Sequence, residues 1–394
     1  MEDGAKSEHR PATRAPSRLT RRAFIPKMAA ALLGAGALLN PQRLLAQTVP
    51  DTADAAGMKY RTLGKTGIEV SAIGFGSHLN DAALNNPLAR AEHIRKGLEL
   101  GITLFDIYDH GLHQFAPMGE ILGPVRQQVV ISLITSWAPS QVLQEVEYAL
   151  KTFGTDYIDL YRIYAETGVS NDEVEMRFQA LQQAKQQGKI RAVGLVAHDH
   201  VQLAQMLRAY PELDYLKLPY NFRHQQFSPV TAVQPLSWDQ AKAKAPAPPS
   251  QEEVPQLDGL SKASSVDCQY YPCPDSGLLS LVRQTGVGLI AIKTFAAGGL
   301  LQLGMADPLI AERLQHAELS LPQAALRFVL DAPEISSAIP SMNSVAEVVE
   351  NVGAVQSGMS QAETELLQLW AEAAERAQGS YLPAQYAWLE QWKA

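Results

Sequence analysis

Short apolar strands alternate with helices along most of this 394-residue chain, and this alternation constrains the fold more than any other feature. Strands separated by helices form parallel sheets, and eight repeats favour a closed barrel over an open, doubly wound sheet. The sequence therefore predicts an α/β fold, a TIM or (β/α)8 barrel. The eight predicted strands cover residues 72–76, 103–105, 129–132, 157–163, 190–196, 215–218, 288–292 and 336–339.

Three other segments belong to the predicted barrel domain, which we assign to residues 58–394. Residues 58–70 read as a small hairpin with Gly64–Gly67 at its turn. An insertion at about 223–274 follows the sixth strand, and its Ala-, Lys- and Pro-rich part predicts an extended excursion. It is either a lid over the active site or a tolerated surface insertion. From Ser360 onward a helical pattern predicts a C-terminal helical tail, which ends in an aromatic stretch.

The first 57 residues resemble a twin-arginine export signal followed by a linker. Thr20-Arg21-Arg22-Ala23-Phe24 precedes an apolar run of about a dozen residues, which is shorter than a membrane-spanning helix. This resemblance predicts export by the twin-arginine machinery to the periplasm or another extracytoplasmic space. A stable membrane span is expected only if the signal stays uncleaved.

Composition excludes several classes of partner and site. The formal net charge is −8 and there is no basic block, which argues against nucleic acid and anionic membranes as main partners. Cys268 and Cys273 are the only cysteines in the sequence, too few for a disulfide framework or a four-thiolate metal centre. They form either one local disulfide or two thiols. The histidines lack a recognisable ligand spacing, so no metal site is predicted.

Ionisable side chains gather where the predicted strands end. The second strand runs directly into Asp106, Tyr108, Asp109 and His110. Because the active site of an α/β barrel lies at the carboxyl ends of its strands, these residues are expected to face a common mouth. Further candidates at the other strand ends are His78, Arg162, Tyr164, His198, Asp199, His200, Lys217, Tyr220 and Lys293. Arg162 alternates with two apolar neighbours, so the pattern leaves open whether it faces inward or outward.

The whole segment from Met58 to about Val355 resembles the aldo/keto reductases. The resemblance is carried by Tyr60–Gly67 with Ile73–Gly76, and by Phe105-Asp106 at the end of the second strand. Further matching motifs are Asp156–Tyr161, Gly188–Gly194, Gln323–Val329, Ile339-Pro340 and Glu350-Asn351. The resemblance implies a barrel enzyme that reduces a carbonyl group of a small-molecule substrate with NADP(H) or NAD(H).

Three of the family's four catalytic positions are substituted in this chain. Asp106 matches the family's aspartate, but His110 stands where the family has its tyrosine acid. Ile134 replaces the lysine at the end of the third strand, and Tyr164 replaces the histidine at the end of the fourth. A lysine from another strand, Lys217 or Lys293, is one way to restore the positive charge beside Asp106. We therefore assign Asp106, His110, Tyr164 and Lys293 as candidate catalytic residues.

The resemblance also implies a set of cofactor contacts. Glu350 and Asn351 keep the family's adenine contacts, whereas Asn343 stands where the family has a cation for the 2′-phosphate. The full set of candidate cofactor-binding residues is Lys217, Phe295, Gly298, Ser341, Asn343, Glu350 and Asn351.

The substitutions leave three functions open. The interpretation we adopt is an oxidoreductase of aldo/keto reductase type with substituted catalytic residues. The first alternative is an exported barrel with lyase, hydrolase or isomerase activity that uses His110 and Asp106 as an acid–base pair. The second is a non-catalytic binding protein that keeps the fold, since fold alone does not fix function.

Overall fold

The computed structural model describes residues 57–76, 87–107, 118–165, 169–198, 200–223, 278–317 and 319–383. The predicted insertion, apart from Arg223, lies outside these ranges, as do both cysteines, the aromatic chain end after residue 383 and the predicted export signal before Gly57. Among the described residues, no helix is both long and apolar enough to cross a bilayer.

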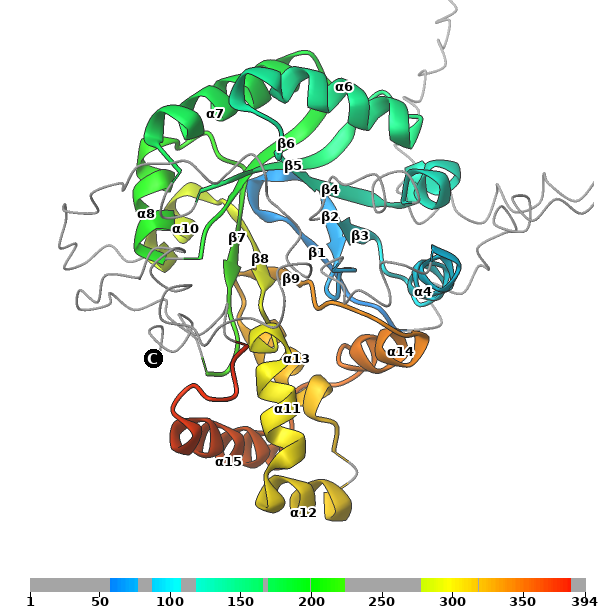
Figure 1. Cartoon of the computed structure of the whole chain (residues 1–394), viewed down its shortest axis with the longest axis vertical. Helices are drawn as coiled ribbons and strands as arrows, with labels where there is room; N and C mark the ends of the chain where they lie inside the picture. The colour runs from blue at the N-terminus through cyan, green and yellow to red at the C-terminus, as the bar shows by residue number, and fades with distance from the viewer. Residues whose placement is uncertain are drawn as a thin grey trace, which may run out of the picture. The chain divides into compact units, whose positions relative to one another are not determined.

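Seven parallel strands follow one another in sequence order, which is the core of the predicted barrel (Figure 1). All seven are entirely buried except at Arg191 and Ile292, in keeping with strands covered by helices on one face and facing a closed interior on the other. The strands are β3 (Leu104–Asp106), β4 (Val130–Ile134), β5 (Ile158–Tyr164), β6 (Ile190–Val196), β7 (Tyr215–Pro219), β8 (Gly288–Ile292) and β9 (Ile335–Ala338).

Residues 73–76 act as the eighth strand and close the barrel. They form parallel bridges to both ends of the seven-stranded sheet, with Ile73 opposite Ala338 and Phe75 opposite Phe105. Gly76 also pairs with Ser341, and a Cβ at Gly76 would meet the Pro340 carbonyl oxygen at 2.5 Å. Glycine is therefore required for the backbones to approach this closely. The fold prediction is confirmed, with the first strand present as bridges rather than a full ladder.

Helices follow most strands and pack around them (Figure 1). Several are preceded by a serine whose hydroxyl accepts the backbone N–H of the residue three positions later, as at Ser170, Ser320 and Ser344. The helices of the barrel wall are α4 (Pro87–Glu99), α6 (Val142–Phe153), α7 (Asn171–Gln186), α8 (His200–Ala209), α10 (Leu278–Thr285), α13 (Leu321–Asp331) and α14 (Val345–Gly353).

An apolar layer and the N-terminal hairpin fill one end of the barrel. The hairpin, β1 (Tyr60–Thr62) and β2 (Glu69–Ser71), presents buried side chains to this layer. Each fully buried Leu or Ile contributes about 1.5–3 kcal/mol through burial. The packed set is Leu63, Ile68, Val70, Leu104, Val130, Leu160, Ala192, Tyr215, Ile290 and Ile339. This apolar floor leaves the opposite end, where the strands terminate, for polar side chains.

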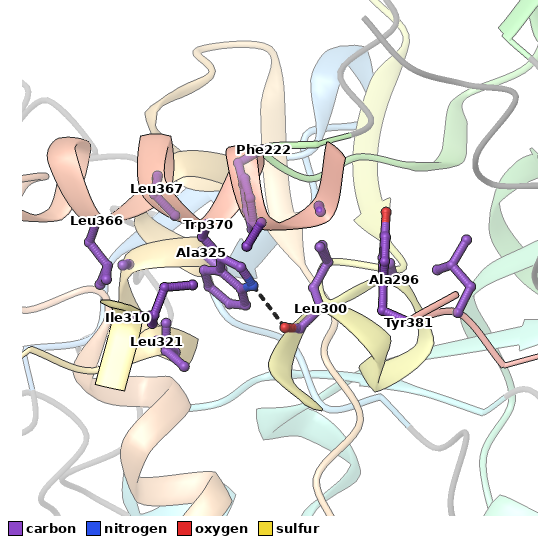
Figure 2. Packing of buried hydrophobic residues seen from close by; sticks show 14 residues of the cluster. Phe222, Ala296, Leu300, Ile310, Leu321, Ala325, Leu366, Leu367, Trp370 and Tyr381 are labelled. Atoms are coloured by element: carbon purple, nitrogen blue, oxygen red, sulfur yellow. Dashed lines mark hydrogen bonds between the residues drawn. The ribbon is translucent and has the colours of Figure 1, made fainter. Parts of the chain in front are cut away.

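A second core lies where α11 (Gly299–Ala306), α12 (Pro308–Ala317) and α15 (Gln361–Ala377) pack together beside α13 (Figure 1). Figure 2 shows its centre, where the fully buried Trp370 ring packs on Phe222 and donates from Nε1 to the Leu300 carbonyl at 2.8 Å. Since Phe222 follows β7 and Leu300 lies in α11, this core braces the chain after the sixth and seventh barrel strands.

Candidate active site

A buried charge cluster occupies the barrel interior below the ends of β3, β5 and β7. Arg162 donates from Nη1 to Oδ1 of Asp106 at 2.7 Å and from Nη2 to Oδ2 at 3.3 Å. Lys217 Nζ also donates to Oδ1 of Asp106, and to the Ser132 hydroxyl at 2.8 Å. Arg162 further donates to Ser132 Oγ and to the Leu133 carbonyl oxygen. Two cations therefore share one carboxylate and one hydroxyl.

Strand geometry explains why these side chains meet. Side chains alternate across a strand, so residues two apart share a face. Leu160 belongs to the apolar floor, so Arg162 lies on the same inner face, and the same spacing carries Tyr215 to Lys217. Asp106 is the last residue of β3, and its side chain is 7% exposed, against 2% for Arg162 and 1% for Lys217. The carboxylate is thus the member of the cluster that comes closest to the mouth.

Burial and mutual charge set the protonation of the cluster. Burial alone raises the pKa of the Asp106 carboxyl, but the charges of Arg162 and Lys217 and their hydrogen bonds outweigh burial and leave the pKa lowered. Burial first and Arg162 second lower the pKa of Lys217 to about 7, although Asp106 opposes them. Burial raises the pKa of the Tyr215 hydroxyl, which lies on the strand of Lys217 and stays protonated. Lys217 is therefore the member of the cluster that exchanges a proton near neutral pH.

Tyr164 and two histidines lie at the ends of neighbouring strands. Tyr164, the last residue of β5, is 7% exposed and meets the His198 ring edge-on with 6.1 Å between centroids. His200 is buried at the start of α8, with Nε2 3.3 Å from the Pro219 carbonyl oxygen. Burial lowers the pKa of His200 to about 4, so this histidine is neutral at pH 7 and is no proton donor there.

The turn after β8 has an unusual backbone. Lys293, Ala296 and Ala297 all have positive φ, a conformation that costs non-glycine residues energy and concentrates at functional sites. Gly298, at φ 88°, precedes α11 and gives that helix no side-chain cap. Helix starts of this kind suit phosphate groups, so the turn fits the pyrophosphate of a dinucleotide. The Lys293 side chain is half-buried, and its carbonyl oxygen accepts from Asn221 Nδ2 at 2.9 Å.

The start of α14 places the carboxylate of Glu347 beside Asn343. Both the backbone N–H and Nδ2 of Asn343 donate to Oε2 of Glu347, at 2.8 and 3.4 Å. A carboxylate already occupies these donors, and it would repel a 2′-phosphate placed beside it. Ser341 lies just before, bridged to Gly76.

The remaining predicted contacts differ in exposure. Asn351 is buried, Phe295 is half-buried, and Glu350 is exposed and accepts from Ser320 Oγ at 2.7 Å. His110, with His78, Tyr108, Asp109 and Asp199, lies outside the described residues. Within the described ranges, no group of three or more His, Cys, Asp or Glu side chains is placed to hold a metal ion.

The structure brings together Asp106 and Lys217, residues 111 positions apart, and adds Arg162 and Ser132. The sequence placed Lys217 among the candidate cofactor contacts and also named it, with Lys293, as a possible partner of Asp106, and it left the direction of Arg162 open. Its inward direction follows from the structure, in which Leu160, two residues earlier on β5, belongs to the barrel floor.

Comparison with known proteins supports the same family. A sequence model of the aldo/keto reductase family matches residues 72–233. Aldo-keto reductase YhdN of Bacillus subtilis is 30% identical over 184 residues, which cover 42% of this chain and 54% of that protein. The chain thus spans about half the length of this relative in the alignment. L-Galactose dehydrogenase of Arabidopsis thaliana is 24% identical over 329 residues, covering 76% of this chain and 88% of the relative.

Two further matches extend over nearly the whole barrel. The NADH-specific methylglyoxal reductase of Escherichia coli is 25% identical over 358 residues, covering 81% of this chain and 100% of that protein. Among solved structures, aldo-keto reductase AKR11C1 from Bacillus halodurans has the same fold, with a TM-score of 0.54 at 20% identity. That match covers 80% of this chain and 97% of the other. Together with the closed barrel and the motifs along it, these matches show that the chain is similar to aldo/keto reductases.

Proposed function

We propose that this protein is a carbonyl reductase that takes hydride from NADH or NADPH. The observation that supports this most is the contact of Lys217 with Asp106. The family pairs its aspartate with a lysine from the third barrel strand, and this chain has Ile134 there. Lys217 reaches the same aspartate from β7, so the charge pair is kept although its position in the sequence has changed.

The residues around the strand ends have separate roles in this proposal. A bound reduced nicotinamide supplies the hydride that carbonyl reduction requires. The turn at 293–298 and the start of α11 would hold its pyrophosphate, and Asn351 and Glu350 its adenine. His110 or Tyr164 would donate the proton to the developing alkoxide, and the cations beside Asp106 would favour that negative charge. Because Glu347 occupies the donors at Asn343, we expect NADH to be preferred over NADPH.

The activity is tested by incubating the purified full-length protein with NADH or NADPH and small carbonyl compounds such as methylglyoxal and glyceraldehyde. We expect loss of the reduced-nicotinamide absorbance that depends on both protein and carbonyl. His110→Ala is expected to reduce the rate about 10²–10⁴-fold, the usual effect of losing a general acid. Tyr164→Phe is the matched comparison, and the variant that loses activity identifies the donor. Full activity in both variants would remove these two residues from the proton-donating role.

We further propose that residues 1–57 direct export through the twin-arginine pathway, on the strength of Arg21-Arg22 and the apolar run that follows. In a bacterial host that has this pathway, the epitope-tagged full chain is expected in the periplasmic fraction. Replacement of Arg21 and Arg22 by lysine should leave it in the cytoplasmic fraction, as should deletion of the host's twin-arginine translocase. A wild-type chain that fractionates with cytoplasmic markers in the intact host would contradict this assignment.

A further inference from the structure

The charge cluster carries more positive than negative charge. Its side chains supply two cations, Arg162 and Lys217, against the single carboxylate of Asp106, and all three residues are at most 5% exposed. Ser132, which both cations contact, is neutral. Buried charge without a counter-charge is costly, so the cluster gains stability by releasing one proton. Of the two kinds of cation, an ammonium group gives up its proton far more readily than a guanidinium group does.

The two cations compete for the same atom. Arg162 Nη1 and Lys217 Nζ both donate to Oδ1 of Asp106, and Arg162 alone also reaches Oδ2. Arg162 therefore holds the carboxylate with two hydrogen bonds whether or not Lys217 is protonated. Lys217 can lose its proton and keep its place, because its amine retains contact with Ser132.

We propose that Lys217 stores the proton that carbonyl reduction consumes, and that Arg162 is a positioning residue that makes this proton releasable by sharing Asp106 with it. This inference rests on the proposed reductase function. Reduction adds one hydride to the carbonyl carbon and one proton to its oxygen. The donor at the mouth gives that proton and is reprotonated from the Lys217 ammonium, which becomes the neutral amine. Water returns a proton to the amine after the alcohol leaves.

The surroundings of Lys217 support this assignment. The charged groups that act on it are Asp106 from β3 and Arg162 from β5, and Tyr215 lies two residues before it on its own strand. Tyr215 stays protonated, because burial raises its pKa, and Asp106 stays ionised. Lys217 is thus the one group of this described set that changes charge between pH 6 and pH 8. Asp106 is the most exposed of the three, at 5% against 1% for Arg162 and 0% for Lys217.

The direct test is an NMR titration of the lysine side chains in the isotopically labelled full-length protein, without cofactor. One lysine is expected to titrate near pH 7 and to be missing from Lys217→Met. In Arg162→Met the repelling cation is gone, so the midpoint should rise by about one pH unit or more. In steady-state assays kcat should fall as pH rises and Lys217 loses its proton. In Arg162→Met this fall should occur at higher pH than in the wild type. Arg162→Lys keeps a cation and should leave the midpoint near its wild-type position.

Arg126→Met is the matched control. Arg126 is also buried and also shares its carboxylate, Asp159, with a second cation, Arg191. Its loss should leave the Lys217 titration unchanged.

If Arg162→Met does not fold, Ser132→Ala replaces it, and loss of this acceptor for the ammonium should lower the midpoint of the Lys217 titration. An ordinary lysine midpoint in the wild type, or a midpoint that does not respond to Arg162 or Ser132, would overturn the proposal. A Lys217 titration near pH 7 in a protein without reductase activity would overturn the proposed function instead.

Discussion

Asp106→Asn is expected to lower the free energy of unfolding by about 3–5 kcal/mol, because it leaves two buried cations without a carboxylate. An amide oxygen still accepts one hydrogen bond, but it supplies no charge to balance Arg162 and Lys217. The variant should unfold at lower urea concentration, and the loss should be greatest at acid pH, where Lys217 is protonated. Carbonyl reduction should fall below detection, since the carboxylate also orients Lys217.

The matched control for this change is Asp156→Asn. Asp156 is exposed, so the same substitution should change stability by less than about 0.5 kcal/mol. Equilibrium urea unfolding of the two variants and the wild type gives the comparison. If Asp106→Asn unfolds at the same urea concentration as the control, the carboxylate does not hold the cluster together and the site as described is wrong.

Lys217→Met is expected to separate activity from stability. It should reduce carbonyl reduction about 10²–10³-fold, the effect of losing one preorganised electrostatic contact. It should also leave the protein as stable as the wild type or more stable, because Arg162 and Asp106 remain as a balanced pair and Met fills much of the same volume. Active sites that hold uncompensated charge commonly show this exchange of stability for function.

The stability that Lys217→Met gains over the wild type should depend on pH, because it follows from the pKa of Lys217. Folding lowers that pKa from its usual 10.5 to about 7, with burial the largest cause and Arg162 the second. Below pH 7 the lysine is protonated in both folded and unfolded chains, and the cost of burying its charge is fully present. Between pH 7 and 10.5 the unfolded chain binds more protons, so the stability of the wild type rises with pH. The advantage of Lys217→Met should therefore be largest near pH 6 and shrink toward pH 10, and a constant difference would contradict the assignment.

The barrel could be predicted from the sequence because its signals are local. Each strand is a short apolar run followed or preceded by turn residues, and seven of the eight predicted runs lie within one or two residues of an observed strand. Gly188, shortly after the end of α7, has a φ of 75°, the left-handed conformation that glycine commonly adopts at helix ends. The first strand could be placed but not classified, since its pairing depends on two distant edges of the sheet.

Helices α11 and α12 could not be predicted in the same way. Gly299 and Gly304 weaken the helical pattern of α11, and the reason for both glycines is tertiary. A Cβ at Gly299 would meet the Tyr381 carbonyl oxygen at 2.3 Å, and one at Gly304 would meet Leu321 and Trp370 at 2.9 Å. These contacts join segments that are far apart in the sequence, so local helix propensity cannot predict them.

The site could be predicted only in part, for the same reason. Asp106 directly follows the predicted strand 103–105 and is the last residue of β3, and this position at a strand end identified it as a candidate. The partners of Asp106 come from other strands, and both faces of β5 are buried, so alternation alone did not assign a direction to Arg162. A buried guanidinium needs a counter-charge, and the closing of the barrel brings one within 2.7 Å.

Dinucleotide binding by the purified full-length protein tests the central claim most directly. Calorimetric titration with NADH and with NADPH requires neither a known substrate nor an active proton donor. Reductase function predicts saturable binding at one site per chain, tighter for NADH than for NADPH because Glu347 occupies the donors at Asn343. Glu347→Gln should narrow the difference in affinity between NADH and NADPH, because it removes the charge that repels a 2′-phosphate. No binding of either dinucleotide, together with no nicotinamide found in the purified protein by mass spectrometry, would contradict the assignment of this barrel as a reductase.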